Sequence, residues 1–308
     1  MRPSGTPFTS AVRSASSVAA RLSRAGWEER ERRHRLRLEP WTAPHLARRR
    51  AGERHAVYDF LFEYYGHPVA KLLRWSPGLG VFLEEGRAFL DRPEWAEADG
   101  GAVLDPARFP AKRIEALDWT LRLLRNTEAR PAHHGCLGLH EWAMVYRMGE
   151  DEVRHGAVPL RFPLPELARI VEAHPVACTH FDAFRFFTPE ARPLNRLQPT
   201  RETQPDLDQP GCLHANMDLY KWAYKFSPWT SGELVADCFE LAAAIRAVDM
   251  RASPYDLVAH GMPEFPPVRI ETPEGRAEYE ALQRGFADRA RPLRRRLIVE
   301  LETLRAAL

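Results

Sequence analysis

Histidines and carboxylates gather in the middle of this 308-residue chain. Seven of the twelve histidines lie between His133 and His214, in a stretch that also carries several Asp and Glu residues. Imidazole is the side chain best suited to proton transfer and metal binding near neutral pH, and a carboxylate is its common partner. The pattern predicts a functional site in residues 133–225, supplied by three short motifs.

The first motif, over residues 133–142, reads HHGCLGLHEW. Residues 135–148 are expected to form a helix, and if the whole motif is helical, His133 and His140 lie seven positions apart and share one face. The functional interpretation is a set of metal ligands or an acid/base cluster, and the alternative is a set of helix-capping and core histidines. The candidate metal ligands are His133, His134 and His140, the candidate catalytic group is Glu141, and the candidate substrate-binding rings are Trp142 and Tyr146.

The second motif, over residues 178–187, reads CTHFDAFRFF, and four phenylalanines interleave with its polar side chains. On a strand, His180 and Asp182 would share one face. Burial among the rings would shift the pKa of either group, as happens in many active sites. Asp182 is a candidate catalytic carboxylate, His180 a candidate metal ligand and Arg185 a candidate substrate contact. The alternative is a structural ion pair between Asp182 and Arg185.

The third motif, over residues 211–225, reads GCLHANMDLYKWAYK. His214 and Asp218 are four positions apart, so both lie on one face of a helix, and Lys221 follows one turn later. This spacing suits an acid/base unit or an activated amine, and the alternative is a surface ion pair. Asp218 and Lys221 are candidate catalytic groups and His214 a candidate metal ligand. The candidate substrate-binding side chains are Asn216, Tyr220 and Trp222.

The elements that position these motifs are expected to be helices. Apolar residues recur at three- and four-residue spacing in residues 110–126, as on a buried helix face. Alternating charges predict a solvated helix in residues 27–54, and the apolar run 57–75 predicts a first core helix. Residues 165–173 read as a short helix. Further helix starts are expected at Thr230 with Glu233, as a capping box, and at Thr272 followed by Pro273, with Pro292 as a kink.

The fold class expected from these elements is mainly α. We expect a single globular helical domain over residues 27–308, with long irregular loops, and a flexible, disordered tail over residues 1–26. The tail is rich in Arg and Ser and has no acidic residue, which is also typical of an organelle transit peptide. Residues 84–111 and the proline-rich stretch 187–212 read as irregular connections, and long loops of the second kind are often lids or binding loops.

The composition of the chain indicates its charge balance, its redox compartment and its relation to membranes. The 44 Lys and Arg residues nearly balance the 42 Asp and Glu residues, and only four of the basic residues are lysines, namely Lys71, Lys112, Lys221 and Lys225. Four cysteines without a CxxC pair favour a reducing compartment, so we expect a cytoplasmic protein. No run of eighteen apolar residues is present, so no membrane contact is expected.

Several familiar catalytic motifs are absent from the sequence. There is no GxGxxG, Walker loop, GxSxG or zinc deaminase signature. The pair His140–Glu141 does not begin an HExxH motif, because residue 144 is Met144. The segment DMRASPYDL, which contains Asp249, marks a turn that we expect to be structural rather than a loop closing over the site.

Five stretches of the chain resemble a family found in actinobacteria whose members are labelled 3-methyladenine DNA glycosylase, or 3-methyladenine glycosylase I-like. They read HPVAKLLRWSPGLGV, HHGCLGLHEWAMVYR, HFDAFRFFTPEARPLN, QPGCLHANMDLYKWAYK and DMRASPYDL, and they spread over residues 67–257. The resemblance implies DNA repair, by hydrolysis of the N-glycosidic bond of an alkylated purine. The Gly-rich hairpin of helix-hairpin-helix glycosylases is not found, so no catalytic residue is transferred by motif.

Three hypotheses follow. The first is the N-glycosylase, whose partner would be DNA or a ligand containing a nucleobase, with a carboxylate activating water and aromatic rings stacking the base. The second is a metal-dependent enzyme, such as a non-haem iron oxygenase or a hydrolase, in which two or three of the five candidate histidines and a carboxylate bind a divalent metal such as iron. The third is a non-catalytic helical binding module.

Overall fold

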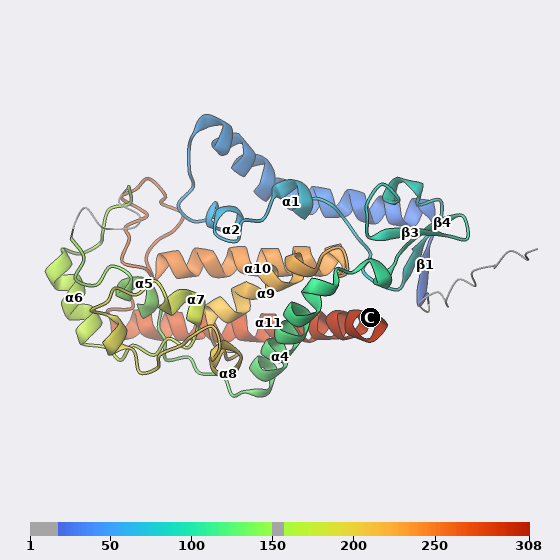
Figure 1. Cartoon of the computed structure of the whole chain (residues 1–308). Coiled ribbons are helices and arrows are strands. Elements are labelled where there is room, and N and C mark those ends of the chain that lie inside the picture. Colours follow the sequence, from blue (N-terminus) through green and yellow to red (C-terminus); the bar gives the residue numbers. More distant parts are fainter. Residues whose placement is uncertain (1–17, 150–156) are drawn as a thin grey trace, which may run out of the picture.

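The computed structural model describes residues 18–149 and 157–308, and the described chain is mainly helical, as expected. Its strands form one small sheet at the end of α1 (Figure 1). The helices are α1 (Arg24–Ala51), α2 (Phe60–Glu63), α3 (Val69–Leu72), α4 (Ile114–Ala129), α5 (Leu139–Ala143), α6 (Leu164–Glu172), α7 (Phe181–Phe184), α8 (Gln204–Leu207), α9 (Leu213–Phe226), α10 (Gly232–Arg251) and α11 (Pro273–Ala307). The strands are β1 (Ala20–Leu22), β2 (Val81–Leu83), β3 (Trp95–Ala98) and β4 (Gly101–Leu104).

The core is centred on α9 and α10, which pack against each other and against α11 (Figure 1). Both central helices are buried on nearly all sides, which is why their sequences are apolar beyond one stripe. Helix α4 packs on α11 and α8, and α1 lies along α10. Within the described residues, no helix is long and apolar enough to cross a membrane.

The sheet has the strand order β1-β2-β4-β3, with β1 parallel to β2 and the other pairs antiparallel. Residues 84–111 therefore contain the β3–β4 hairpin, where the sequence suggested an irregular connection. The strands have three or four residues each, too few for a clear alternation of apolar and polar positions. Gly101 is required here, because a Cβ at this position would lie 2.2 Å from the carbonyl oxygen of Leu83.

The expected tail needs a correction at its inner end. Residues 1–17 lie outside the described residues, so the expectation of disorder there is untested. Residues 20–22, however, form β1 in register with β2, and α1 begins at Arg24 with Ser23 as its N-cap. The boundary expected at residue 26 therefore lies too far along the chain.

Two expected helices are much shorter than the sequence suggested. Residues 57–75 contain the four-residue helices α2 and α3, separated by Gly66 in a left-handed conformation and by Pro68. Residues 135–148 contain only α5, because the chain turns through positive φ angles at Leu137 and Gly138 before it and at Arg147 after it. These interruptions limit α5 to five residues, all of which are buried.

The remaining helix expectations hold, with one shift. The regions expected from apolar spacing become α4 and α6, and Thr272 caps the start of α11, which runs through Pro292 without a break. The cap of α10 is Ser231 rather than Thr230: its hydroxyl accepts a hydrogen bond from the backbone of Leu234. Residues 187–212 are largely irregular and include the short α8.

Candidate functional site

The three sequence motifs meet in the core of the protein. The ring of His140 on α5 lies 4.5 Å, centroid to centroid, from that of His214 on α9, and the His214 ring lies 5.6 Å from that of His180. His180 Nε2 lies 3.7 Å from an oxygen of Asp218. Segments separated by up to 78 positions thus contribute to one buried row of imidazoles and carboxylates.

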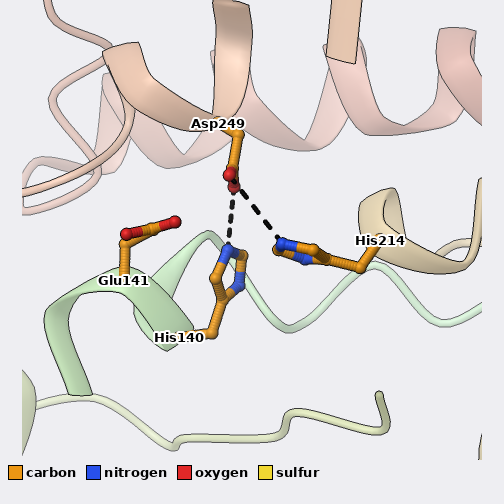
Figure 2. A group of neighbouring side chains, drawn as sticks. All are labelled: His140, Glu141, His214 and Asp249. Atoms are coloured by element: carbon orange, nitrogen blue, oxygen red, sulfur yellow. Dashed lines mark hydrogen bonds and ion pairs between the residues drawn. The ribbon is translucent and has the colours of Figure 1, made fainter. Parts of the chain in front are cut away.

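One end of this row is an ionic cluster around Asp249, a residue of α10 (Figure 2). One Asp249 oxygen lies 2.8 Å from His140 Nε2, and the other lies 3.9 Å from His214 Nε2. Arg246, one turn earlier on α10, donates to Asp249 over 3.0 Å and to Glu141 over 3.2 Å. Asp249 and Arg246 are almost inaccessible to solvent, so each charge depends on the others for compensation.

These contacts fix the charge states in the Asp249 cluster. Burial lowers the pKa of His140, but the charge and hydrogen bond of Asp249 outweigh it and hold that pKa well above the usual value. Burial raises the pKa of Asp249, but charged His140 holds it below its usual range. Burial and the charge of His140 lower the pKa of His214. The cluster therefore combines a charged His140 with a neutral His214, whose single unprotonated ring nitrogen can accept a hydrogen bond or bind a ligand.

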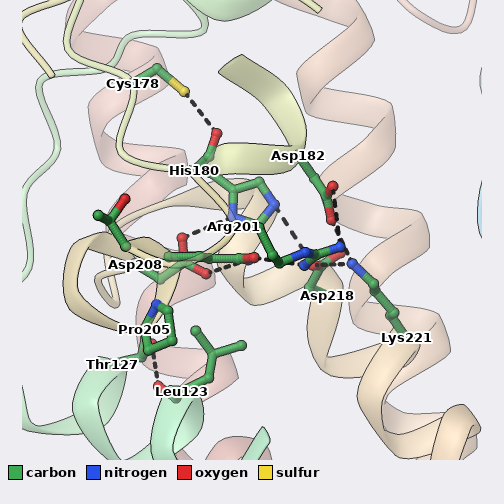
Figure 3. Close-up of polar contacts among 12 residues, drawn as sticks. Leu123, Thr127, Cys178, His180, Asp182, Arg201, Pro205, Asp208, Asp218 and Lys221 are labelled. Carbon is green, nitrogen blue, oxygen red and sulfur yellow. Dashed lines mark hydrogen bonds and ion pairs between the residues drawn. The ribbon is translucent and has the colours of Figure 1, made fainter. Parts of the chain in front are cut away.

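The other end of the row is a pair of carboxylates bridged by a lysine (Figure 3). Lys221 Nζ lies 2.6 Å from Asp182 and 3.1 Å from Asp218, and the hydroxyl of Tyr65 donates to Asp218 over 2.9 Å. Burial raises the pKa of Asp182, but the charge and hydrogen bond of Lys221 outweigh it and lower that pKa, so the carboxylate is ionised at neutral pH. His180 is oriented by a 3.0 Å hydrogen bond from Nδ1 to Asp208.

Asp182, one of these two carboxylates, borders an open cleft of about 880 Å³. The lining includes all four lysines of the chain: Lys71 from α3, Lys112 from the 3-10 helix Ala111–Arg113, and Lys221 and Lys225 from α9. Three arginines join them against two acidic residues, so the cleft is strongly positive although the whole chain has a net charge of only +2. A cleft of one charge sign concentrates ligands of the opposite sign.

Aromatic rings form the walls of the same cleft. Trp119 on α4 and Trp222 on α9 lie 5.5 Å apart, and Tyr64, Tyr65 and Tyr224 complete the lining. The ammonium groups of Lys221 and Lys225 lie 4.6 and 5.3 Å from the Trp222 ring. Rings and cations are therefore combined in the way that suits a ligand with both a planar ring and an anionic group.

Within residues 18–149 and 157–308, two groups of residues could hold a metal ion by geometry. The ligand atoms of His140, Glu141, His214 and Asp249 all lie within 4.8 Å of one another, and so do those of His180, Asp182 and Asp218. Each group already contains a cation of the protein, Arg246 in the first and Lys221 in the second. A metal ion would have to share its carboxylates with that cation.

The structure does not bring every expected site residue to the cleft or to the row. Four of the six expected substrate-binding residues are core or structural: the Trp142 indole donates to the backbone of Ala252, Tyr146 donates to Glu172, Asn216 pairs with Arg294, and Tyr220 is fully buried. Trp222 and Arg185 do line the cleft. His133 and His134, expected as metal ligands, precede the turn before α5 and belong to neither metal-competent group.

Sequence reasoning missed several important residues. Asp249 was treated as structural, and Arg246 and Asp208 were not considered. Asp249 and Arg246 are the charged residues of a mostly apolar part of α10, and buried charges of this kind are rarely unpaired. These two charged residues in an apolar stretch were the sequence signal that could have identified the Asp249 cluster. The scarcity of lysine was visible too, but nothing in the sequence placed the four together.

Comparison with protein-family models, with curated proteins and with solved structures found no match. The interpretation of the site therefore depends on its geometry and chemistry.

A first prediction concerns His67, at the edge of the cleft. Its ring stacks on Tyr224 at 3.7 Å, and burial, followed by the charges of Lys71 and Lys221, lowers its pKa to about 3. In the unfolded chain the value is about 6.5, so between these values protons bind the unfolded state more tightly. Stability is therefore lost as the pH falls below about 6.5, by ~2 kcal/mol at pH 5 from this residue alone.

We expect His67→Phe, which keeps the ring but cannot be protonated, to reduce the loss of stability between pH 7 and pH 5. Urea unfolding at the two pH values measures the difference. His133→Phe is the matched control, because His133 is exposed. Equal acid sensitivity of wild type and His67→Phe would contradict the prediction.

Proposed function

We propose that this protein hydrolyses an N-glycosidic bond, and that its substrate is the alkylated purine in DNA that the sequence resemblance implies. The observation that carries the proposal is the ionised carboxylate of Asp182, held by Lys221 at the border of a basic, aromatic cleft. The proposal treats the described chain from β1 onward as one mainly helical domain, because α3, α4, α7 and α9 all contribute to the cleft. Its four unpaired thiols suit a reducing cytoplasm.

The chemistry requires an anion near the sugar. Departure of the base leaves positive charge on the sugar ring, and a nearby carboxylate stabilises that charge or activates the water that attacks it. Asp182 is suited to this role because Lys221 keeps it ionised and because it borders the cleft. An alkylated purine carries a positive charge of its own, so it leaves as a neutral base without a strong acid catalyst.

The cleft suits a nucleic acid backbone beside that carboxylate. Four of the seven basic side chains in the cleft have no carboxylate partner among the described residues and can neutralise phosphates, namely Lys71, Lys112, Arg113 and Lys225. Trp119 with Trp222 offers ring surfaces for bases. The arginines of α1 are a poorer phosphate surface, since Arg32, Arg33 and Arg35 are paired with glutamates of the same helix.

The direct test is base release. Purified, untagged protein is incubated with methylated duplex and single-stranded DNA, with and without EDTA, and free methylpurines are measured by mass spectrometry. We expect release of 3-methyladenine or another methylpurine that EDTA does not suppress. Absence of any released base from either DNA form would refute the proposal. If alanine substitutions in the site then lowered only the melting temperature, a non-catalytic binding module would be the better description.

A second prediction concerns the cleft charges. Lys112→Gln and Lys225→Gln are each expected to weaken DNA binding and to reduce the slope of log K against log salt by about 1, because each removes one phosphate-neutralising charge. Fluorescence anisotropy over a salt series measures the slope. Arg49→Gln, an exposed charge on α1 that does not line this cleft, is the control and should leave the slope unchanged. Equal slopes in all variants would place the DNA elsewhere.

One observation favours a metal-dependent enzyme as the second candidate. Four ligand atoms, that of Asp249 included, converge in the Asp249 cluster, and two of them come from imidazoles, as in mononuclear sites of divalent metals. The metal-dependent enzyme ranks second because the charge of Arg246 already compensates the carboxylates of Glu141 and Asp249. Elemental analysis of untagged protein distinguishes the candidates: stoichiometric iron, zinc or manganese, lost in His214→Ala, would reverse the ranking.

A further inference from the structure

A second cavity, of about 350 Å³, shares Asp182 and Tyr64 with the cleft. Side chains of α2, α5, α7, α9 and α10 line it, and its volume lies within the range of small-molecule sites, roughly 300–1,000 Å³. Because Asp182 borders both spaces, a ligand that extended from one to the other would pass beside this carboxylate.

The lining of the second cavity differs in character from that of the cleft. The cleft combines four lysines and three arginines with two acidic groups. The second cavity has no lysine: apolar side chains and rings, among them Phe60, Phe186 and Met144, line it together with four carboxylates, two arginines and two histidines. Its polar groups include both signs of charge. The cavity thus suits an uncharged planar molecule better than a phosphate.

The buried polar groups of this cavity include a donor without a partner. Arg246 is about 1% exposed, and its Nε–H makes no hydrogen bond, although its Nη1 is bound to Glu141 and Asp249. A buried donor without a partner costs free energy, which an acceptor of a bound ligand would recover. Glu141 and the neutral His214 line the cavity beside it and approach Asp249 from two sides (Figure 2). The Arg246 donor beside the acceptors of Glu141 and His214 is complementary in hydrogen bonding to the edge of a nitrogen heterocycle.

We propose that the second cavity binds the purine base of the substrate while the basic cleft holds its phosphates. This inference rests on the proposed function and assigns each part of the substrate to its own compartment. The bond between base and sugar then crosses the shared wall at Asp182 and Tyr64, where the ionised carboxylate faces the sugar. Arg246 Nε–H donates to a ring nitrogen or oxygen of the base.

The test uses the free base 3-methyladenine as the probe, because it lacks sugar and phosphate. Isothermal titration calorimetry of the full chain is expected to show saturable binding that is insensitive to salt. Arg246→Lys keeps the positive charge beside Glu141 and Asp249 but removes the Nε–H donor, and should weaken binding about tenfold. Phe186→Ala, which removes one ring of the lining, should weaken it as well. Lys225→Gln, in the cleft, should bind the free base like wild type.

The outcomes separate this inference from the proposed function. Release of methylpurine from DNA without saturable binding of free base at millimolar concentration would overturn the inference and leave the function standing. Binding of free base that is lost in Lys225→Gln and kept in Arg246→Lys and Phe186→Ala would place the base in the cleft and also overturn it. Binding with the expected variant pattern but without release from DNA would support a base-binding cavity and refute the glycosylase. Melting temperatures of the variants identify any that fail to fold.

Discussion

Replacement of Asp182 by asparagine is expected to lower the rate of base release by a factor of about 10³, within the range of 10²–10⁴ typical for loss of a general base. The substitution keeps the size of the side chain but removes the negative charge that would stabilise the sugar cation or activate water. Lys221 retains Asp218 as a partner at 3.1 Å, so the buried ammonium remains compensated and the fold should persist. Single-turnover kinetics with methylated DNA measures the effect.

The controls for Asp182→Asn separate chemistry from binding. DNA binding should be unchanged or slightly tighter, because the variant removes an anion from a basic cleft. Asp206→Asn, at an exposed carboxylate on α8, is the matched substitution and should leave the rate unchanged. A rate for Asp182→Asn within tenfold of wild type would exclude this carboxylate as the catalytic group.

Replacement of Arg246 by methionine is expected to destabilise the fold by about 3–5 kcal/mol, the usual effect of removing one partner from a buried ion pair. Glu141 and Asp249 would then be left with His140 as the remaining nearby charge. For a chain of this size the loss corresponds to a fall in melting temperature on the order of 10 °C. Calorimetry and urea unfolding measure it.

A double-mutant cycle tests the cause of that loss. Adding Glu141→Gln to Arg246→Met removes one of the uncompensated charges and should recover part of the stability, whereas a loss due only to packing would not be recovered. Arg246→Lys should cost less than Arg246→Met because the charge remains. Arg49→Met, at an exposed position on α1, is the control. A loss below about 1 kcal/mol in Arg246→Met would show that the Asp249 cluster does not depend on this arginine.

Local spacing was sufficient to predict the longer helices. The apolar repeat of α4, the charge pattern of α1 and the Thr272–Pro273 start of α11 are each contained within a few turns of chain. The same reasoning was wrong for α5, because the chain takes positive φ angles at Leu137 and Gly138. Tertiary packing also constrains this turn: a Cβ on Gly138 would lie 3.3 Å from Ala252, more than 100 positions away. Strands β1 and β2 escaped notice because their pairing partners are distant in sequence, and the β3–β4 hairpin because strands of four residues are too short for a clear alternation.

The types of residue in the site were also visible in the sequence, but their roles were not. The density of His and Asp in the three motifs indicated where chemistry could occur, since such residues are rarely placed together in a core without partners. Trp142 and Trp222 have similar sequence surroundings, yet one is a core residue and the other lines the cleft. The orientation of each helix relative to its neighbours decides whether its tryptophan is buried in the core or lines the cleft.

The sequence by itself determined the mainly helical character of the protein, its scarcity of lysine, and the three motifs that supply imidazoles and carboxylates. Tertiary structure alone decided that Arg246 and Asp249 join His140 and that four lysines from three distant segments line one cleft. The physical reason is that helix formation follows from interactions within a few residues, whereas charge compensation and cavity shape depend on which helices pack against each other.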